Sequence, residues 1–244
     1  MSKLIVANWK MNGSIKKINN DLNYYLNNMT TNRQNIVFAF PFTYIAYAKS
    51  IFDDKQTQSK LASQDLSRYG GYGAYTGEIS NDILLDCGVT YSIIGHSERR
   101  VLNDTDEILI DKLNMAFNSR IKPIYCVGES YKVRQLHQYL EFLSKQLSIL
   151  TKTKHIKDLV VAYEPIWAIG TNLVPEMKEI EEVALFIKDY ISKTIPGINL
   201  LVLYGGSVNG SNASDILDVP GIDGVLVGGA SLKIDEFTAI CNVV

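Results

Sequence analysis

The chain alternates short apolar segments with longer amphipathic segments, eight times along its length. Most of the short segments are continuously apolar and rich in β-branched residues, which is typical of parallel strands buried on both faces. They span residues 4–7, 36–40, 61–63, 91–95, 123–127, 159–162, 200–204 and 224–227. The segment at 61–63 has the weakest strand pattern. This alternation predicts an α/β protein built from eight strand–helix units.

The segments between the predicted strands carry apolar residues at helical spacing. The clearest examples are residues 15–29, 133–150 and 180–191. Ser14 stands at a predicted helix start, and Asp104 with Thr105 stands at another. Pro175 precedes the segment at 180–191, where its fixed φ suits a first helical turn. We therefore expect helices between successive strands.

The length of the chain fits one domain. It has 244 residues, and neither a low-complexity tract nor a charge run marks a linker. Eight βα units in a chain of this size match a (β/α)8 barrel, whereas an open doubly wound sheet usually has fewer strands. We predict a single domain over residues 1–244, a barrel of eight parallel strands with outer helices.

Composition excludes several classes of function. With 24 basic and 26 acidic residues, the net charge of -2 predicts no nucleic-acid partner. The three cysteines lack the paired spacing of a zinc or redox site, so we interpret them as reduced thiols. The N-terminal apolar run is too short for a secretory signal, and no segment approaches a membrane span. We expect a cytoplasmic protein with a small ligand, no membrane partner, no metal and no cofactor.

Polar residues gather just after the predicted strands. In a barrel the loops that follow the strands converge at one rim, where active sites lie. The candidates there are Asn8, Lys10, Gln64, Asp65, His96, Glu98, Glu129 and Glu164. An amide, an ammonium, an imidazole and a carboxylate around one cavity can bind an oxyanionic substrate and move its protons. Glu164 is the candidate base, since it follows a buried strand and precedes a loop that could close over it.

The two loops after the last strands are rich in glycine. One contains Gly205, Gly206 and Ser207, and the other contains Gly228 and Gly229. Backbone N–H groups in such loops can approach a phosphate closely, and barrels frequently bind phosphate at this place. Either glycine pair alone would be explained more simply by a tight turn.

Taken together, these segments resemble the triosephosphate isomerase family over the whole chain. The matching motifs are residues 8–13, 73–78, 94–100, 125–129 and 162–171 and the two glycine loops. Each motif is moderately specific, but their order and spacing leave little room for another family. The resemblance implies a TIM barrel that interconverts dihydroxyacetone phosphate and D-glyceraldehyde 3-phosphate through an enediolate, in glycolysis and gluconeogenesis.

The resemblance also implies catalytic roles. Glu164 would remove the proton beside the carbonyl, neutral His96 would donate to the carbonyl oxygen, and Lys10 would offset the developing charge. This pairing of a glutamate base with a neutral histidine is the family's own known chemistry rather than a result of the sequence pattern. Asn8 would help to hold the substrate.

The resemblance further implies a phosphate site and a lid. Backbone N–H groups of Gly170, Ser207, Gly228 and Gly229 would bind the phosphate. Ile169 and Leu226 would form an apolar clamp around the base. A loop from Pro165 to about Pro175 would close over the substrate and exclude water.

The second half of this lid departs from the family pattern. Asn172 stands where the family usually has glycine, and asparagine tolerates a left-handed backbone. Pro175 falls where the family donates a backbone N–H to the hydroxyl of the residue matching Tyr204, and proline has no N–H. Our hypothesis is that this latch is absent here or uses a neighbouring group.

Three tyrosines predict an interface. Tyr69, Tyr72 and Tyr75 lie among glycines in a segment that a monomer would leave exposed. In the family this loop docks into a second subunit and brings the residue matching Thr76 near the loop of Asn8 and Lys10. We expect a homodimer formed through the loop around Tyr75 and Thr76.

Several residues have a simpler explanation. His137, within a predicted helix, and His155, in a polar linker, are expected at the surface. Glu98 and Glu129 could be structural ion-pair partners, Glu98 for Lys10. Cys126 is expected to serve packing.

Two alternative functions stay open at this stage. A Schiff-base aldolase needs a lysine at the active rim, but Lys122 lies at the start of its strand, at the other rim. A catalytically silent barrel that binds a sugar phosphate would be indicated by loss of the base or the imidazole, and Glu164 and His96 are both present.

Overall fold

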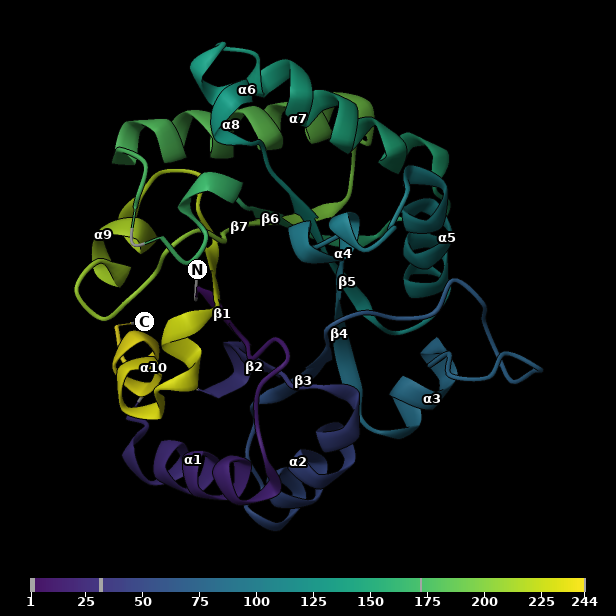
Figure 1. The fold of residues 1–244 in the computed structure, drawn as a ribbon, viewed down its shortest axis with the longest axis vertical. Helices are drawn as coiled ribbons and strands as arrows, with labels where there is room; N and C mark the ends of the chain where they lie inside the picture. Colours follow the sequence, from purple (N-terminus) through teal and green to yellow (C-terminus); the bar gives the residue numbers. More distant parts are fainter. Residues whose placement is uncertain (1–2, 31–32, 172, 244) are drawn as a thin grey trace.

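The computed structural model describes residues 3–30, 33–171 and 173–243. Its strands form a closed parallel barrel in chain order, in which β8 pairs with β1 (Figure 1). The strands are β1 (Leu4–Asn8), β2 (Ile36–Ala39), β3 (Lys60–Ser63), β4 (Val89–Ile94), β5 (Lys122–Val127), β6 (Asp158–Tyr163), β7 (Asn199–Tyr204) and β8 (Gly224–Val227). The predicted barrel is confirmed, and so is its weakest strand, β3.

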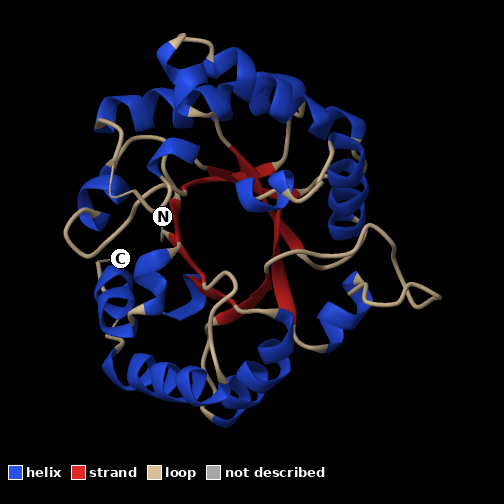
Figure 2. Ribbon diagram, viewed as in Figure 1, coloured by secondary structure: helices blue, strands red, loops and turns tan. Residues whose placement is uncertain are grey.

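Helices surround the barrel on all sides (Figure 2). The α-helices are α1 (Ile15–Asn28), α2 (Phe42–Asp54), α3 (Asn81–Asp86), α4 (Ser97–Val101), α5 (Asp106–Phe117), α6 (Tyr131–Gln135), α7 (Tyr139–Ser148), α8 (Met177–Thr194), α9 (Ala213–Asp218) and α10 (Ile234–Cys241). Short 3-10 helices are η1 (Arg33–Asn35), η2 (Ile149–Lys152), η3 (Ile166–Ala168) and η4 (Gly229–Leu232). No helix among the described residues is long and apolar enough to cross a membrane.

Both faces of the strands are buried, which explains their continuous apolar sequences. Leu4 and Val6 of β1 pack with side chains from the other strands inside the barrel. The alternate residues Ile5 and Ala7 belong to the larger core between barrel and helices. Because successive side chains of a strand point to opposite faces, a strand between two cores is apolar at every position.

Two helix starts agree with the sequence, and one does not. Ser14 caps α1 by accepting from the N–H of Lys17, and Thr105, rather than Asp104, caps α5. Pro175 was predicted in the first turn of α8, but that helix begins at Met177. Its N-cap is the residue that follows the proline, which takes part in a capping box.

The long helix predicted over residues 133–150 is also wrong. The structure divides this segment into α6, α7 and η2. His137 lies between the first two, with a left-handed backbone at φ 54°. The apolar spacing continues across the break because buried Leu143 and Leu147 of α7 join the same core as Leu150 of η2. The surface positions predicted for His137 and His155 are confirmed.

Candidate active site

The carboxyl-end rim of the barrel holds a cavity of about 300 Å³. Its lining includes every predicted site residue, namely Asn8, Lys10, His96, Glu164, Gly170, Ser207, Gly228 and Gly229, together with Ile169 and Leu226 of the predicted clamp. A larger cavity of about 620 Å³ lies at the opposite rim, beside the starts of β5 and β6. The smaller cavity is the candidate site, because a carboxylate and an imidazole meet there.

Glu164 lies directly after β6 and is 2 % exposed. Its backbone N–H donates to the carbonyl oxygen of Val127 at the end of β5, at 2.7 Å. A Cβ atom on the adjacent Gly128 would lie 1.7 Å from the carbonyl oxygen of Glu164, so only glycine allows this approach. The pairing of two strand ends therefore fixes the backbone of the candidate base.

The carboxylate of Glu164 has two polar contacts. Its Oε1 lies 3.2 Å from Nε2 of His96, and its Oε2 accepts from the backbone N–H of Ser97 at 3.2 Å. Burial raises the pKa of Glu164, while its neighbours His96, the Ser97 N–H, Cys126 and Lys10 act against this rise. A carboxylate with a raised pKa holds a proton more readily, so it is a stronger base.

His96 occupies the turn between β4 and α4 and is 5 % exposed. Its Nδ1 accepts from the backbone N–H of Glu98 at 3.2 Å. An imidazole that accepts at Nδ1 is neutral and carries its proton on Nε2. The hydrogen bond to Glu98 therefore leaves a donor at Nε2, the nitrogen that faces Glu164.

Lys10 follows β1 with a left-handed backbone at φ 52°. The carbonyl oxygen of Lys10 accepts from Nε2 of Gln64, and this Nε2 also donates to the carbonyl oxygen of Ala39. The backbone N–H of Lys10 donates to Oδ1 of Asn8 at 3.1 Å. Such a conformation costs about 1–3 kcal/mol in a residue other than glycine and persists where neighbours impose it. Lys10 Nζ pairs with Glu98 at 2.7 Å, as the sequence predicted.

The glycine loops form the other end of the cavity. Gly205 leaves room for the base, since a Cβ there would lie 2.9 Å from Cγ of Glu164. Ser207 Oγ donates to the carbonyl oxygen of Ala168 at 2.6 Å, which joins the loop after β7 to the lid. Ser231 Oγ donates to the carbonyl oxygen of Gly228 at 2.7 Å. Gly205, Gly206, Gly228 and Gly229 all line the cavity.

The predicted lid contains η3 and then Ile169 and Gly170, both of which line the cavity. Asn172, the unusual residue of the predicted lid, lies outside the described residues. Trp167 anchors the start of the lid, because its Nε1 donates to Oε1 of fully buried Glu129 at 3.2 Å. The sequence presented Glu129 only as a doubtful ion-pair partner, and no spacing pointed to Trp167.

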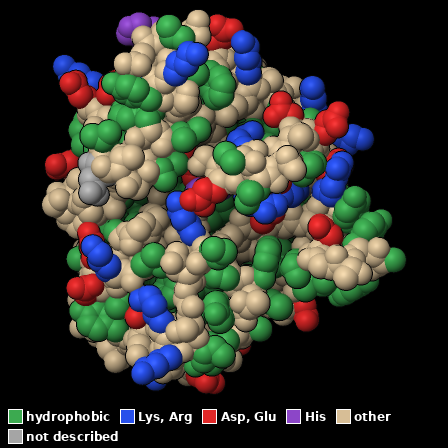
Figure 3. All heavy atoms as spheres, viewed as in Figure 1, with side chains coloured by type: hydrophobic (Ala, Val, Ile, Leu, Met, Phe, Trp, Pro, Cys, Tyr) green, Lys and Arg blue, Asp and Glu red, His purple; other side chains and the backbone are tan. Residues whose placement is uncertain are grey.

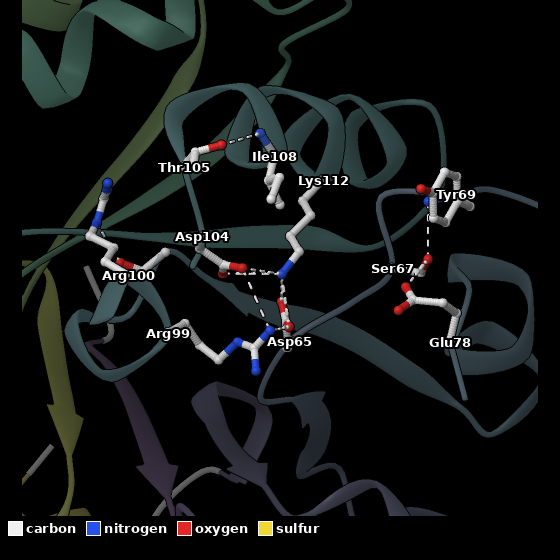
Figure 4. A network of polar contacts seen from close by, with 11 residues as sticks. Asp65, Ser67, Tyr69, Glu78, Arg99, Arg100, Asp104, Thr105, Ile108 and Lys112 are labelled. Atoms are coloured by element: carbon white, nitrogen blue, oxygen red, sulfur yellow. Dashed lines mark hydrogen bonds and ion pairs between the residues drawn. The ribbon is translucent and has the colours of Figure 1, made fainter. Parts of the chain in front are cut away.

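Beside the loops after β3 and β4, four charges form what we call the Lys112 cluster (Figure 4). Nζ of Lys112 donates to both carboxylate oxygens of Asp65 and of Asp104, at 2.7 to 3.0 Å. Arg99 Nη2 lies 2.9 Å from Asp65. Burial raises the pKa of Asp65, against the effect of Lys112. The cluster ties the loops after β3 and β4 to α5, and so supports the segment that carries His96.

Among the described residues, no group of three or more His, Cys, Asp and Glu side chains is arranged to hold a metal ion. Cys87 and Cys126 form no disulfide among the described residues, and burial raises the pKa of Cys126 beside Glu164.

Comparison with known proteins decides the family. The model of the family described as triosephosphate isomerase matches residues 3–244. The chain belongs to the triosephosphate isomerase family. Curated relatives named triosephosphate isomerase include that of Francisella philomiragia subsp. philomiragia, 39% identical with 99% of this chain and 97% of the relative covered. That of Shewanella pealeana is 36% identical, with 98% and 96% covered. The predicted family and the enzyme class, an isomerase, are confirmed.

Proposed function

We propose that this isomerase interconverts dihydroxyacetone phosphate and D-glyceraldehyde 3-phosphate, with Glu164 as its base. The observation that carries the proposal is the buried pair of Glu164 and His96, whose Oε1 and Nε2 lie 3.2 Å apart beside Lys10. A base and a neutral donor at one cavity are what proton transfer next to a carbonyl requires.

The proposed reaction moves one proton between neighbouring carbons. Glu164 takes the proton from the carbon beside the carbonyl, and the C–H electron pair forms the double bond of an enediolate. His96 donates from Nε2 to the oxygen that gains charge, and the ammonium of Lys10 stabilises that charge. The proton then returns to the neighbouring carbon, which was the carbonyl carbon. The hydroxyl on the first carbon gives its proton back to His96 and becomes the new carbonyl, which completes the isomerisation. The chemistry uses side-chain protons, so we propose neither metal nor cofactor.

The glycine loops would bind the phosphate. Backbone N–H groups of Gly170, Ser207, Gly228 and Gly229 are the proposed donors, supported by their place at the cavity and by the absence of bulky side chains there. Ile169 and Leu226 flank the same cavity and would exclude water when the lid closes. Closure would also protect the enediolate from losing phosphate.

A coupled isomerase assay on the purified protein tests this proposal. Glu164→Asp and His96→Gln should each lower kcat by about 10² or more, since a positioned acid or base contributes roughly 10²–10⁴ in rate. Turnover that neither substitution changes would refute the roles. Binding of substrate without turnover in the unaltered protein would instead favour a silent sugar-phosphate-binding barrel.

We also propose a homodimer formed through the loop around Tyr75 and Thr76. The loop between β3 and α3 projects from the right of the barrel in Figure 1, and Figure 3 shows hydrophobic side chains on it. Tyr72 is 80% exposed there, and the rings of Tyr69 and Tyr75 stack at 4.1 Å. Sedimentation should show a dimer, and an active monomer would contradict it. The free thiols of Cys87 and Cys126 support the predicted cytoplasmic location.

A further inference from the structure

The lid has two ends, and each end is tied to a carboxylate. At its start, Trp167 donates to Glu129, which also accepts from the hydroxyl of Tyr163 at 3.0 Å. At its far end, α8 begins with a capping box in which the N–H of Glu176 donates to Oε2 of Glu179 at 2.8 Å. Glu129 and Glu179 therefore mark the two places where the lid joins the barrel.

Arg134 of α6 lies between these two carboxylates. Its Nη1 is 3.9 Å from Oε1 of Glu129, and its Nη2 is 3.1 Å from Oε1 of Glu179. The guanidinium also lies over the ring of Tyr139, 4.0 Å from its centre. Figure 1 shows α6 next to α8, at the top of the view. We call Glu129, Arg134 and Glu179 the Arg134 cluster.

The contacts of this cluster are ion pairs without hydrogen-bond geometry. Within the described part of the chain, Nη1 and Nη2 of Arg134 and Oε2 of Glu129 are buried and have no hydrogen-bond partner. Complementary groups that lie close together without bonding can bond after a small shift. The cluster is therefore able to respond when Trp167 or the start of α8 moves.

We infer that Arg134 is a positioning residue that couples the two ends of the lid through Glu129 and Glu179. It does not line the cavity, so its effect on the reaction is indirect. By attracting one carboxylate from each end, it makes the two ends move together and sets how Ile169 and Gly170 lie over the substrate. This inference rests on the proposed function, in which the lid shields the enediolate.

The first test is Arg134→Gln in the isomerase assay. We expect kcat/KM to fall roughly tenfold, because the lid closes less completely. The share of turnovers that release inorganic phosphate should rise, because a less completely closed lid leaves the enediolate free to eliminate phosphate. In that elimination the enediolate electrons form a new carbon–carbon double bond, the C–O bond to the phosphate breaks, and phosphate leaves with the bonding electron pair. Arg134→Lys keeps the charge without the planar fork and should restore part of the loss. A merely structural role would lower the active fraction without changing this partition.

The second test uses the fluorescence of Trp167. The chain has two tryptophans, and the other, Trp9, is fully buried against Phe40. In a Trp9→Phe background, inorganic phosphate should shift the emission of Trp167 as the lid responds. Adding Arg134→Gln should reduce this shift at saturating phosphate.

Two further variants separate coupling from simple loss of charge. Glu179→Gln removes the ion pair with Arg134 but keeps the capping box, which accepts glutamine equally. Glu179→Gln should also raise the share of turnovers that release inorganic phosphate. The double variant with Arg134→Gln should raise this share little further than Arg134→Gln alone. The matched control is Lys145→Gln, which breaks the exposed Lys145–Glu141 pair of the neighbouring helix and should change nothing.

The outcomes distinguish the two proposals. If the unaltered protein does not isomerise triose phosphates, the proposed function fails. If it does isomerise them, and folded Arg134→Gln keeps its kcat/KM, its phosphate-release share and its Trp167 response, the coupling role is wrong. Should Arg134→Gln fail to fold, Arg134→Lys and Glu179→Gln decide the same question by the same readouts.

Discussion

The Lys112 cluster and the Arg134 cluster are both built from buried charges near the candidate site, but they are bonded differently. Lys112 donates to four carboxylate oxygens at 2.7 to 3.0 Å. Arg134 approaches two carboxylates but forms no hydrogen bond with either. The first cluster supports the loop of His96, which must hold one position, and the second adjoins the lid. Buried charge thus fixes one side of the site and leaves the other able to rearrange.

The strongest test of this contrast is Lys112→Met. Removing the ammonium leaves buried Asp104 and half-buried Asp65 without their main partner, and breaking such a buried pair costs about 3–5 kcal/mol. Arg134→Gln should cost less, about 1–2 kcal/mol, because Glu129 keeps its bonds from Tyr163 and Trp167. Urea unfolding measures both free energies. Equal losses of unfolding free energy in the two variants would contradict the difference in bonding between the clusters.

A second test follows the charge of buried Glu164. Because burial raises its pKa, the acid limb of kcat/KM should lie above the ordinary glutamate value of 4.5. The folded protein then keeps a proton that the unfolded chain releases, so stability falls as pH rises from 4.5 through the folded pKa.

Glu164→Gln removes the titrating carboxyl group at position 164. Between pH 4.5 and the raised pKa of Glu164, the free energy of unfolding should therefore fall less in this variant than in the unaltered protein. Asp65, whose pKa is also raised by burial, contributes equally to both proteins and cancels in the comparison. Parallel pH profiles of the two proteins in urea unfolding would contradict the raised pKa.

The smallest expected effect is that of Tyr204→Phe. The hydroxyl of Tyr204 is buried, with no hydrogen-bond partner in the described residues, and burial and Glu129 raise its pKa. Pro175 offers it no N–H, so we expect turnover to change less than about threefold and stability to stay within about 1 kcal/mol. A loss of turnover near a hundredfold would show that the closed lid does latch on this hydroxyl.

The sequence predicted the barrel well because its strands are buried on both faces, which leaves continuous apolar runs. Helix ends were less predictable. His137 interrupts a run whose apolar spacing continues, and Pro175 precedes the N-cap of α8 instead of entering its first turn. Local sequence patterns cannot show where these helices begin and end, because tertiary packing decides it.

The candidate site was predictable where its residues follow strands, since chain order alone brings those ends together. Lys112 and Arg134 were not, because each occupies an ordinary polar position in a helix. Their partners lie far away in sequence, such as Asp65 for Lys112 and Glu179 for Arg134. No spacing rule in one sequence reveals such a pair.

The contact between Gly128 and the carbonyl oxygen of Glu164 limits how this protein can vary. A side chain at position 128 touches no substrate, yet it would displace the backbone that carries the base. In a saturation-mutagenesis library, position 128 should therefore tolerate nothing but glycine. A redesign of the cavity for another substrate has to leave this residue unchanged, even though it contributes no chemistry of its own.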